Sequence, residues 1–463
     1  IHSIMGAGKI SDGSLDASNM LKPYLEGGDI RFIGTTTYEE YNKHMAGSVG
    51  ITRRFQQVDI AEPSVEDTIK IMLGLKQGYE KYHGIVIKND IIDYAVRVCA
   101  QHIPDRRFPD KAIDIIDEAG AYLELHPKNR QTQYLDKAIV NMVMSKLCKI
   151  DAEVMKTEDN SLLATLKARM LSRVFGQDEA VGQVVEAVQM SKAGLIDSDK
   201  PLASLLFVGP TGVGKTEVAR SLADELGVEL VRFDMSEYAE KHAVAKLIGS
   251  PAGYVGYEDG GLLTDAIRKK PNCVLLFDEI EKAHSDIYNI LLQVMDYAKL
   301  TDNRGCQADF HNVVIIMTSN AGAQYASQAS VGFLGGVSKG EAMMKQVKKS
   351  FKPEFINRLS ATVVFHDMSH DMATRILHKK LAQLQQKLAA KNVTIDIEGN
   401  AEEWLLAKGF TTEYGAREMD RVIARYLKPL LMHEILFGSL KKGGNAKIVI
   451  NDNNELELCK KKN

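Results

Sequence analysis

The chain has 463 residues, which is more than one hydrophobic core supports, so we expect two to four domains. Its hydrophobic content of 45% and charged content of 26% are those of an ordinary globular protein. Because the net charge is −3, no overall basic field draws the chain to nucleic acid or to a membrane surface, and neither is an expected partner.

The cysteines, the lack of long apolar runs and the start of the chain indicate where the protein is located. Five cysteines are scattered without C-x-x-C spacing, which is typical of a reducing compartment and does not indicate a structural zinc site. No apolar run is long enough to cross a bilayer, and no signal peptide opens the sequence. These features predict a cytoplasmic protein, and the first residue, Ile1, indicates a piece of a longer one.

The first 150 residues have two differently patterned parts. Residues 1–62 begin within a domain. We expect a helix over 15–25 and a buried strand over 30–34. Glu62 and Pro63 break this part from the next. Residues 63–150 look all-helical, and Ser64 is placed to cap the first helix because acidic residues follow it.

The rest of the chain begins with a polar, helix-prone stretch over 151–173, which we interpret as a linker. Residues 174–366 then alternate apolar strands with helical segments, with strands expected over 205–208, 230–234, 274–278 and 313–318. This α/β alternation predicts a parallel sheet with helices on both faces. Residues 367–463 form a smaller domain, with helices over 371–391 and 400–408, a strand over 393–397, and a hairpin of 446–450 with 455–458.

A glycine-rich stretch follows the strand at 205–208 and matches the phosphate-loop pattern G-x-x-x-x-G-K-[ST] in full. The residues expected to bind nucleotide are Gly209, Pro210, Thr211, Gly212, Val213, Gly214, Lys215 and Thr216. The glycines let backbone N–H groups turn toward phosphate oxygens, and the next helix adds positive potential. We expect Lys215 to reach the β- and γ-phosphates of ATP and Thr216 to ligate Mg²⁺.

Polar side chains end two later strands of the same expected sheet. Asp278 and Glu279 follow an apolar run, and a carboxylate at the carboxyl end of a parallel strand faces the nucleotide crevice. We expect Asp278 to hold Mg²⁺, directly or through water, and Glu279 to orient and polarise the attacking water. Asn320 ends the strand at 313–318, where it can bond the γ-phosphate or that water, although an asparagine there is also a common turn residue.

These motifs are followed by Arg358 and Arg417, and their order resembles that of AAA+ ATPases. The resemblance implies that Arg358 is an arginine finger, which reaches the γ-phosphate held by the neighbouring subunit. It also implies that Arg417 is a second sensor acting within its own chain. The resemblance therefore implies a ring, expected to be a homohexamer, with ATP and Mg²⁺ as cofactors. Taken alone, each arginine would be an ordinary surface ion pair.

The resemblance is closer than to AAA+ ATPases in general. Residues 174–463 resemble the second ATPase module of the Clp/Hsp100 unfoldases. Residues 1–62 and 63–150 resemble the later part of the first module's large domain and its small helical domain. Thr36 then stands at the first-sensor position, and Arg53 and Arg54 stand where finger arginines lie. The resemblance implies that the first phosphate loop, the first main pore loop and the adaptor-binding N-domain lie outside this sequence, so adaptor binding is not expected.

Two loops of the second module carry the resemblance further. Gly253, Tyr254, Val255 and Gly256 resemble a pore loop, with Tyr254 as the residue that grips substrate. A second axial loop is expected over 302–308. Val331, Gly332 and Phe333 lie in a long irregular insertion and resemble the tripeptide that docks Clp unfoldases on the ClpP peptidase. Val331 departs from this pattern, because isoleucine is the usual residue there.

No coiled-coil insertion interrupts residues 63–150, so within the family the sequence resembles the ClpA branch. This implies an ATP-dependent unfoldase, without peptidase activity, that threads unfolded or degron-tagged proteins into ClpP in the bacterial cytosol. The alternative is a stand-alone disaggregase. A third reading, a scaffold that binds nucleotide without hydrolysing it, is opposed by the pair Asp278 and Glu279.

Overall fold

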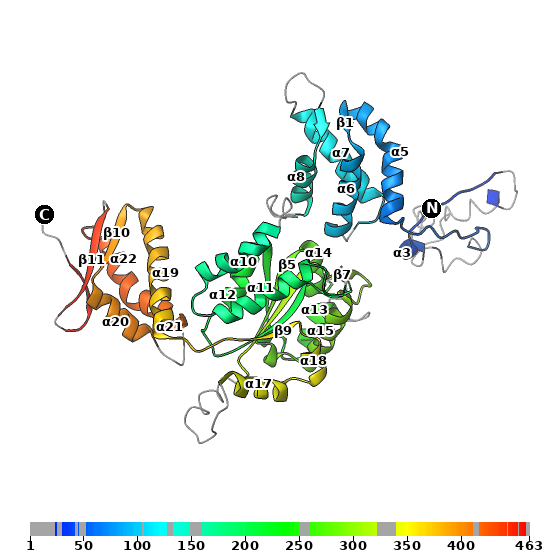
Figure 1. The fold of residues 1–463 in the computed structure, drawn as a ribbon. Coiled ribbons are helices and arrows are strands. Elements are labelled where there is room, and N and C mark those ends of the chain that lie inside the picture. Colours follow the sequence, from blue (N-terminus) through cyan, green and yellow to red (C-terminus); the bar gives the residue numbers. More distant parts are fainter. Residues whose placement is uncertain are drawn as a thin grey trace, which may run out of the picture. The chain divides into compact units, whose positions relative to one another are not determined.

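The structure is a computed structural model, and it divides into two compact units, Ile1–Pro63 and Ser64–Asn463 (Figure 1). The residues that the structure describes are 24–25, 30–41, 45, 52–103, 106–126, 133–148, 160–197, 199–250, 260–321, 339–410, 416–441, 443–451 and 453–459. Among them, no helix combines the length and the apolar character that crossing a membrane requires.

The first unit contains the short helix α3 (Tyr38–Glu40), which Thr37 caps by accepting a hydrogen bond from the Glu40 N–H at 3.3 Å. The buried strand expected over 30–34 is wrong. These residues are exposed, Ile33 to 96%, and no strand pairs with them in the described part of the unit. An apolar run becomes a strand only where a neighbouring strand satisfies its backbone groups, and the run itself does not specify that neighbour.

The second unit begins with a helical part, in which four helices pack around one apolar core. The helices are α5 (Val65–His83), α6 (Asn89–His102), α7 (Asp110–Leu125) and α8 (Lys137–Cys148). Ser64 caps α5, as predicted, by accepting from the Asp67 N–H at 3.1 Å. The all-helical prediction is wrong, because β1 (Ile85–Ile87) and β2 (Gln133–Leu135) form a parallel pair. Strands of three residues are too short to show alternation.

The stretch interpreted as a linker needs correction in its second half. Helix α10 (Asn160–Arg173) packs against α11 (Asp178–Lys192), and its residues Leu166 and Met170 are fully buried in the core of the sheet domain. Its apolar side chains are interspersed with polar ones without a strong heptad, so the sequence alone does not show which of them face a core. A narrow apolar stripe is nevertheless enough to attach a helix to a core.

A five-stranded, all-parallel sheet forms the centre of this domain, as predicted, in the order β4-β5-β8-β3-β9. The strands are β3 (Ala203–Val208), β4 (Glu229–Asp234), β5 (Cys273–Asp278), β8 (Val313–Ser319) and β9 (Ala361–Val364). We did not anticipate β9. Because side chains alternate along each strand, Leu205 and Phe207 enter one core while Leu206 and Val208 enter the other.

Helices cover both faces of this sheet (Figure 1). On one face lie α10, α11 and α12 (Lys215–Leu226). On the other lie α13 (Lys241–Ile248), α14 (Leu262–Lys269), α15 (Ser285–Tyr297), α17 (Lys339–Ser350) and α18 (Pro353–Asn357). Short 3₁₀ turns, η2 (Met235–Tyr238) and η4 (Ile280–Lys282), follow β4 and β5. Strands β6 (Lys299–Thr301) and β7 (Gln307–Asp309) form a hairpin. The expected axial loop over 302–308 covers the turn of this hairpin and the start of β7.

The C-terminal part packs helices against a three-stranded sheet with its own core (Figure 1). The helices are α19 (His370–Ala389), α20 (Gly399–Gly409), α21 (Ala416–Val422), the π-helical η5 (Ile423–Leu427) and α22 (Lys428–Leu436). The predicted hairpin is confirmed as β11 (Gly444–Ile450) with β12 (Leu456–Cys459). The predicted strand β10 (Val393–Ile397) joins the same sheet, parallel to β11.

Candidate nucleotide-binding site

The phosphate loop joins β3 to α12 and wraps around the ammonium group of Lys215. Gly212 and Gly214 have positive φ angles of 81° and 104°, which only glycine adopts readily, so the tight turn requires both. Lys215 is 8% exposed, and its Nζ donates to the carbonyl oxygens of Gly209 at 2.6 Å and Pro210 at 2.9 Å. The loop therefore places a positive charge inside a backbone cradle at the N-terminus of a helix.

Asn320 lies next to this lysine, although the two residues are far apart in sequence. The Lys215 Nζ donates to Asn320 Oδ1 at 2.7 Å. Because an ammonium group can only donate, this contact turns the amide oxygen toward Lys215 and leaves the amide nitrogen to donate elsewhere. The backbone N–H of Asn320 is held by Glu281 Oε1 at 2.9 Å. Asn320 is thus fixed at both ends, with a donor available for a phosphate oxygen or a water molecule.

Asp278 ends β5, beside β8, and has two partners. Thr318 Oγ1 donates to its Oδ1, and Arg232 Nη2 lies 2.7 Å from its Oδ2. Thr318 also accepts the backbone N–H of Glu279 at 3.0 Å, so one hydroxyl joins both strand-end acids. Our sequence reasoning missed Thr318 and Arg232. The available signal was a hydroxyl residue inside the otherwise apolar end of β8, and a charged residue near the end of β4.

Glu279 has a left-handed backbone, with φ of 57°, which a non-glycine residue adopts only where its surroundings hold it there. Its Oε2 accepts from Ser236 Oγ at 3.0 Å and pairs with Lys282 Nζ at 2.5 Å. The hydrogen bond from Lys282 is the main reason that the pKa of Glu279 lies below its usual value, and Ser236 lowers the pKa further, against the effect of burial. Glu279 is therefore an ionised carboxylate, which can accept a proton or orient water.

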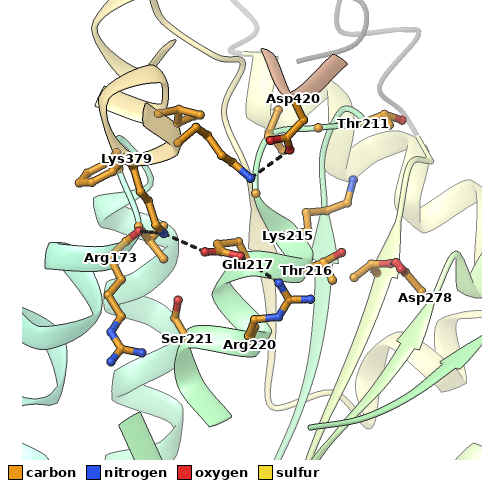
Figure 2. A pocket seen from close by; sticks show the side chains of 18 of the residues that line it. Arg173, Thr211, Lys215, Thr216, Glu217, Arg220, Ser221, Asp278, Lys379 and Asp420 are labelled. Carbon is orange, nitrogen blue, oxygen red and sulfur yellow. Dashed lines mark hydrogen bonds and ion pairs between the residues drawn. The ribbon is translucent and has the colours of Figure 1, made fainter. Parts of the chain in front are cut away.

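The phosphate loop, Asp278, Glu279 and Asn320 line one cavity of about 660 Å³, a volume typical of small-molecule and cofactor sites. Figure 2 shows Lys215, Thr216 and Asp278 around the same space, with Lys379 and Asp420 reaching it from the C-terminal helices α19 and α21. The side chains of Lys380 and Asp420 are joined at 3.0 Å. The cavity thus brings together the phosphate loop, the strand-end residues Asp278, Glu279 and Asn320, and the C-terminal domain.

The residues present fit a nucleoside triphosphate with Mg²⁺. The glycine cradle suits phosphate oxygens. Asp278 pairs with the guanidinium group of Arg232 at 2.7 Å, so its carboxylate already faces a positive charge. Thr216 and Asp278 would hold the metal, which would neutralise charge on the phosphates. Among the described residues, no group of three or more His, Cys, Asp or Glu side chains is placed to hold a metal ion.

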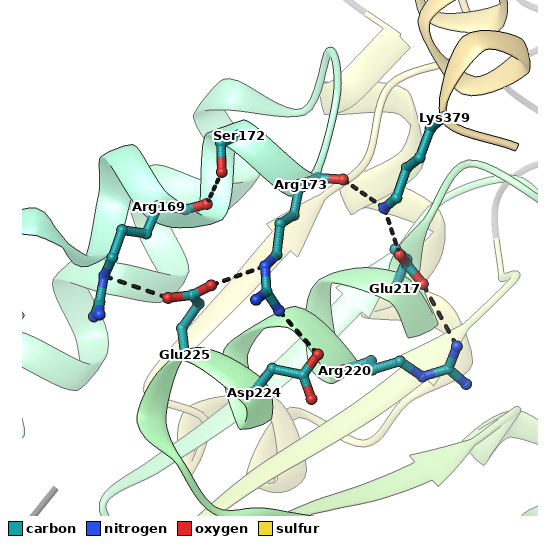
Figure 3. A network of polar contacts seen from close by, with 8 residues as sticks. All are labelled: Arg169, Ser172, Arg173, Glu217, Arg220, Asp224, Glu225 and Lys379. Carbon is teal, nitrogen blue, oxygen red and sulfur yellow. Dashed lines mark hydrogen bonds and ion pairs between the residues drawn. The ribbon is translucent and has the colours of Figure 1, made fainter. Parts of the chain in front are cut away.

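A network of ion pairs connects the phosphate-loop helix to its neighbours (Figure 3). Lys379 Nζ lies 2.8 Å from Glu217 Oε1, and it donates to the carbonyl oxygen of Arg173 at 2.8 Å. Arg173 in turn pairs with Glu225 at 2.9 Å and with Asp224 at 3.0 Å. Burial raises the pKa of Glu217, but the hydrogen bond and charge of Lys379 outweigh it, so the pKa lies below its usual value. Glu217 is therefore ionised.

Of the remaining predicted residues, Arg358 is the one whose side chain the structure describes in the second unit, and it does not line this cavity. Arg358 directly follows α18, is 41% exposed in its side chain, and pairs with Asp296 at 2.5 Å. Arg417 lies in the first turn of α21, and its side chain is outside the described part of the chain. Thr36, Arg53 and Arg54 belong to the first unit and are exposed. The predicted pore loop and docking tripeptide lie outside the described residues; they are Gly253, Tyr254, Val255, Gly256, Val331, Gly332 and Phe333.

Three family models match successive parts of the chain. They are the AAA lid domain over 64–169, the AAA domain (Cdc48 subfamily) over 200–362, and the C-terminal, D2-small domain of ClpB protein over 368–448. A solved structure of the Saccharomyces cerevisiae Hsp104:casein complex in its extended conformation is 33% identical. It matches with a TM-score of 0.82, covering 99% of this chain and 79% of that chain.

Two curated relatives are similar to this chain in sequence. The ClpA homolog protein of Fuscovulum blasticum is 46% identical over 98% of this chain and 57% of its own length. The ATP-dependent Clp protease ATP-binding subunit ClpC of Staphylococcus epidermidis is 39% identical over 97% of this chain and 63% of its own length. The chain thus spans 57% and 63% of the length of these relatives. Together with the parallel sheet and the phosphate-loop cavity, these matches show that the chain belongs to the Clp/Hsp100 family of AAA+ ATPases.

Proposed function

We propose that residues 64–463 bind ATP with Mg²⁺ and hydrolyse it in the cavity beside the phosphate loop. The observation that carries this proposal is the meeting of Lys215, Asn320 and the acids Asp278 and Glu279 around one space. Lys215 and the loop N–H groups bind the phosphates, and Thr216 and Asp278 hold the metal. Glu279 orients the attacking water as general base, and the Asn320 amide donates to the γ-phosphate or to that water.

We further propose that the site is completed by Arg358 from the neighbouring subunit of a homohexamer, and by Arg417 from its own C-terminal domain. Arg358 is exposed beyond its pair with Asp296, which supports a role at a subunit contact. In the first unit, Thr36, Arg53 and Arg54 have the corresponding sensor and finger roles. The proposed parts are 1–62 and 63–150 for the first module, 151–173 between the modules, and 174–366 and 367–463 for the second. The three matched family models support the division of the second unit.

The work done by hydrolysis is proposed to be unfolding and translocation of protein substrates. Tyr254 in the pore loop grips the polypeptide, and Val331, Gly332 and Phe333 dock the ring on ClpP in the cytoplasm. The ClpA homolog and the ClpC protease subunits among the relatives support this reading. A stand-alone disaggregase is the second candidate. It is favoured by a ClpB chaperone that is 37% identical and by the resemblance to Hsp104.

The hydrolysis proposal is tested by Glu279→Gln, which keeps the shape of the side chain but removes the base. We expect ATP turnover to fall by roughly 10²- to 10⁴-fold while ATP remains bound, since positioned general bases contribute about that much. The control is Glu240→Gln, the same change at a side chain that is 76% exposed. Turnover at the wild-type rate in Glu279→Gln would remove Glu279 from the reaction.

A further inference from the structure

Arg232 lies near the carboxyl end of the edge strand β4 and reaches across to β5. Its Nη2 is 2.7 Å from Asp278 Oδ2, and its side chain also lines the cavity. The Asp278 side chain is 10% exposed, whereas that of Arg232 is 48% exposed. The pair therefore joins a mostly buried carboxylate to a cation that remains partly in solvent.

The contact has a clear electrostatic reason. A carboxylate this far out of water is stable as an anion only when a positive charge or several donors compensate it. Thr318 provides one donor, to Oδ1, and Arg232 provides the charge, at Oδ2. Two other arginines line the cavity. Arg220 is directed to Glu217, at 3.7 Å, and Arg173 pairs with Glu225 and Asp224. Arg232 is thus the arginine assigned to the carboxylate that is expected to face the metal.

A second acceptor lies within reach of the same guanidinium group. Asp234, two residues along β4, has its Oδ2 3.8 Å from Arg232 Nη2. The Asp234 carboxylate also accepts the backbone N–H of Ser236 at 3.0 Å, which fixes its position. Because nearly half of the Arg232 side chain is exposed, a small rotation can transfer it from Asp278 to Asp234 without burying an unpaired charge.

We propose that Arg232 competes with Mg²⁺ for Asp278. It is a positioning residue: it neutralises the carboxylate in the metal-free protein and moves toward Asp234 when the metal arrives with the nucleotide. This inference rests on the proposed function, since it assumes a metal–nucleotide complex in the cavity. Its consequence is that part of the affinity for Mg²⁺ is used to displace the arginine, so the cation requirement of nucleotide binding is set partly by Arg232.

The test measures linkage between metal and nucleotide by equilibrium binding, without turnover. The dissociation constant of a fluorescent, non-hydrolysable ATP analogue is determined in excess Mg²⁺ and again in EDTA, and the ratio of the two is taken for each variant. The main variant is Arg232→Gln. Arg220→Gln is the matched control, because it removes the same charge from the same cavity without touching Asp278. Arg232→Lys restores the charge, and thermal unfolding checks that each variant is folded.

Removing Arg232 should weaken binding of the ATP analogue in EDTA, because a cation near the phosphates is lost. It should also increase the gain in analogue affinity that Mg²⁺ provides, because the metal no longer has to displace the arginine. We expect the EDTA-to-Mg²⁺ ratio to rise by at least about fivefold in Arg232→Gln, the lower end of typical coupling between linked sites. Arg220→Gln should leave the ratio near wild type, and Arg232→Lys should restore much of it. An unchanged or lower ratio in folded Arg232→Gln overturns the inference. A wild-type protein that binds no analogue overturns the proposed function instead.

Discussion

Thr318 shows how one side chain can set the geometry of a reaction centre. Its hydroxyl donates to Asp278 and accepts the N–H of Glu279 at 3.0 Å, and the residue is 1% exposed. In Thr318→Val the shape is kept but both contacts are lost, which leaves the partly buried N–H of Glu279 without this partner. We expect a loss of about 1–3 kcal/mol in the free energy of unfolding, as for buried polar groups left unsatisfied.

The same variant should separate binding from chemistry. Its phosphate loop is untouched, so the dissociation constant for nucleotide should stay within about a factor of three of wild type while kcat falls. Steady-state kinetics and urea unfolding measure the two effects. Thr318→Ser retains the hydroxyl and should restore most of kcat. A Thr318→Val protein with normal kcat would show that the hydroxyl does not position the two acids.

The positions of single site residues were predictable where a local sequence motif determines them. Asp278 ends an apolar strand, and Lys215 and Asn320 come after the carboxyl ends of two others. Parallel strands bring such ends to one edge, so their proximity could be inferred from the sequence. Arg232 and Thr318 could not be inferred in this way. Arg232 reaches Asp278 across a strand pairing, and Thr318 contacts it from β8, so both contacts depend on sheet order and register. A sequence shows which residues end strands but not which strands are neighbours.

At the scale of helices, one lysine joins three elements. Lys379 of α19 binds Glu217 in the first turn of α12 and the carbonyl oxygen of Arg173, which ends α10 (Figure 3). A double-mutant cycle of Glu217→Gln with Lys379→Met should give a coupling of roughly 0.3–1 kcal/mol in the free energy of unfolding. We expect no more, because the side chains are 41% and 27% exposed and solvent screens the pair.

The pH dependence of this coupling has a definite sign. Because the folded pKa of Glu217 lies below its ordinary value of 4.5, the ion pair contributes fully above 4.5, and its contribution is lost as pH falls through the folded pKa. Salt should weaken the coupling as well. A second cycle with Lys380→Met is the control, since Lys380 pairs with Asp420 and acts on Glu217 only as a weaker, unbonded charge, so its coupling should be smaller. Equal coupling in both cycles, or coupling that grows toward low pH, would contradict the assignment.

Elements with a strong apolar period were predictable, and short or weakly patterned ones were not. The buried strands β3, β5 and β8 are continuous apolar runs, which is the expected pattern for a parallel sheet with both faces covered. The three-residue strands β1 and β2 are too short to have a period. Helix α10 mixes apolar and polar side chains without a strong period, so its sequence did not show that Leu166 and Met170 face a core.

For the whole molecule, the two candidate functions differ in one partner, the ClpP peptidase. The segment that would contact it, Val331, Gly332 and Phe333, lies outside the described residues, so the proposal depends on its sequence alone. An aromatic side chain on a loop can act as an anchor in a partner's pocket, and truncating such an anchor typically costs at least about 2 kcal/mol of binding. Phe333→Ala should therefore abolish ClpP-dependent degradation of an unfolded substrate and leave ATP hydrolysis within twofold of wild type.

A matched variant controls for the loss of an apolar side chain, and assays of the wild-type protein decide between the two functions. Leu195→Ala also truncates an apolar side chain, 78% exposed, but in the loop after α11, and it should degrade substrate like wild type. If Phe333→Ala degrades substrate normally, the docking assignment is wrong. If the wild-type protein hydrolyses ATP and recovers aggregated protein but never supports degradation by ClpP, the chain acts as a disaggregase. The same phosphate-loop site would then drive the threading of substrate without a peptidase to receive it.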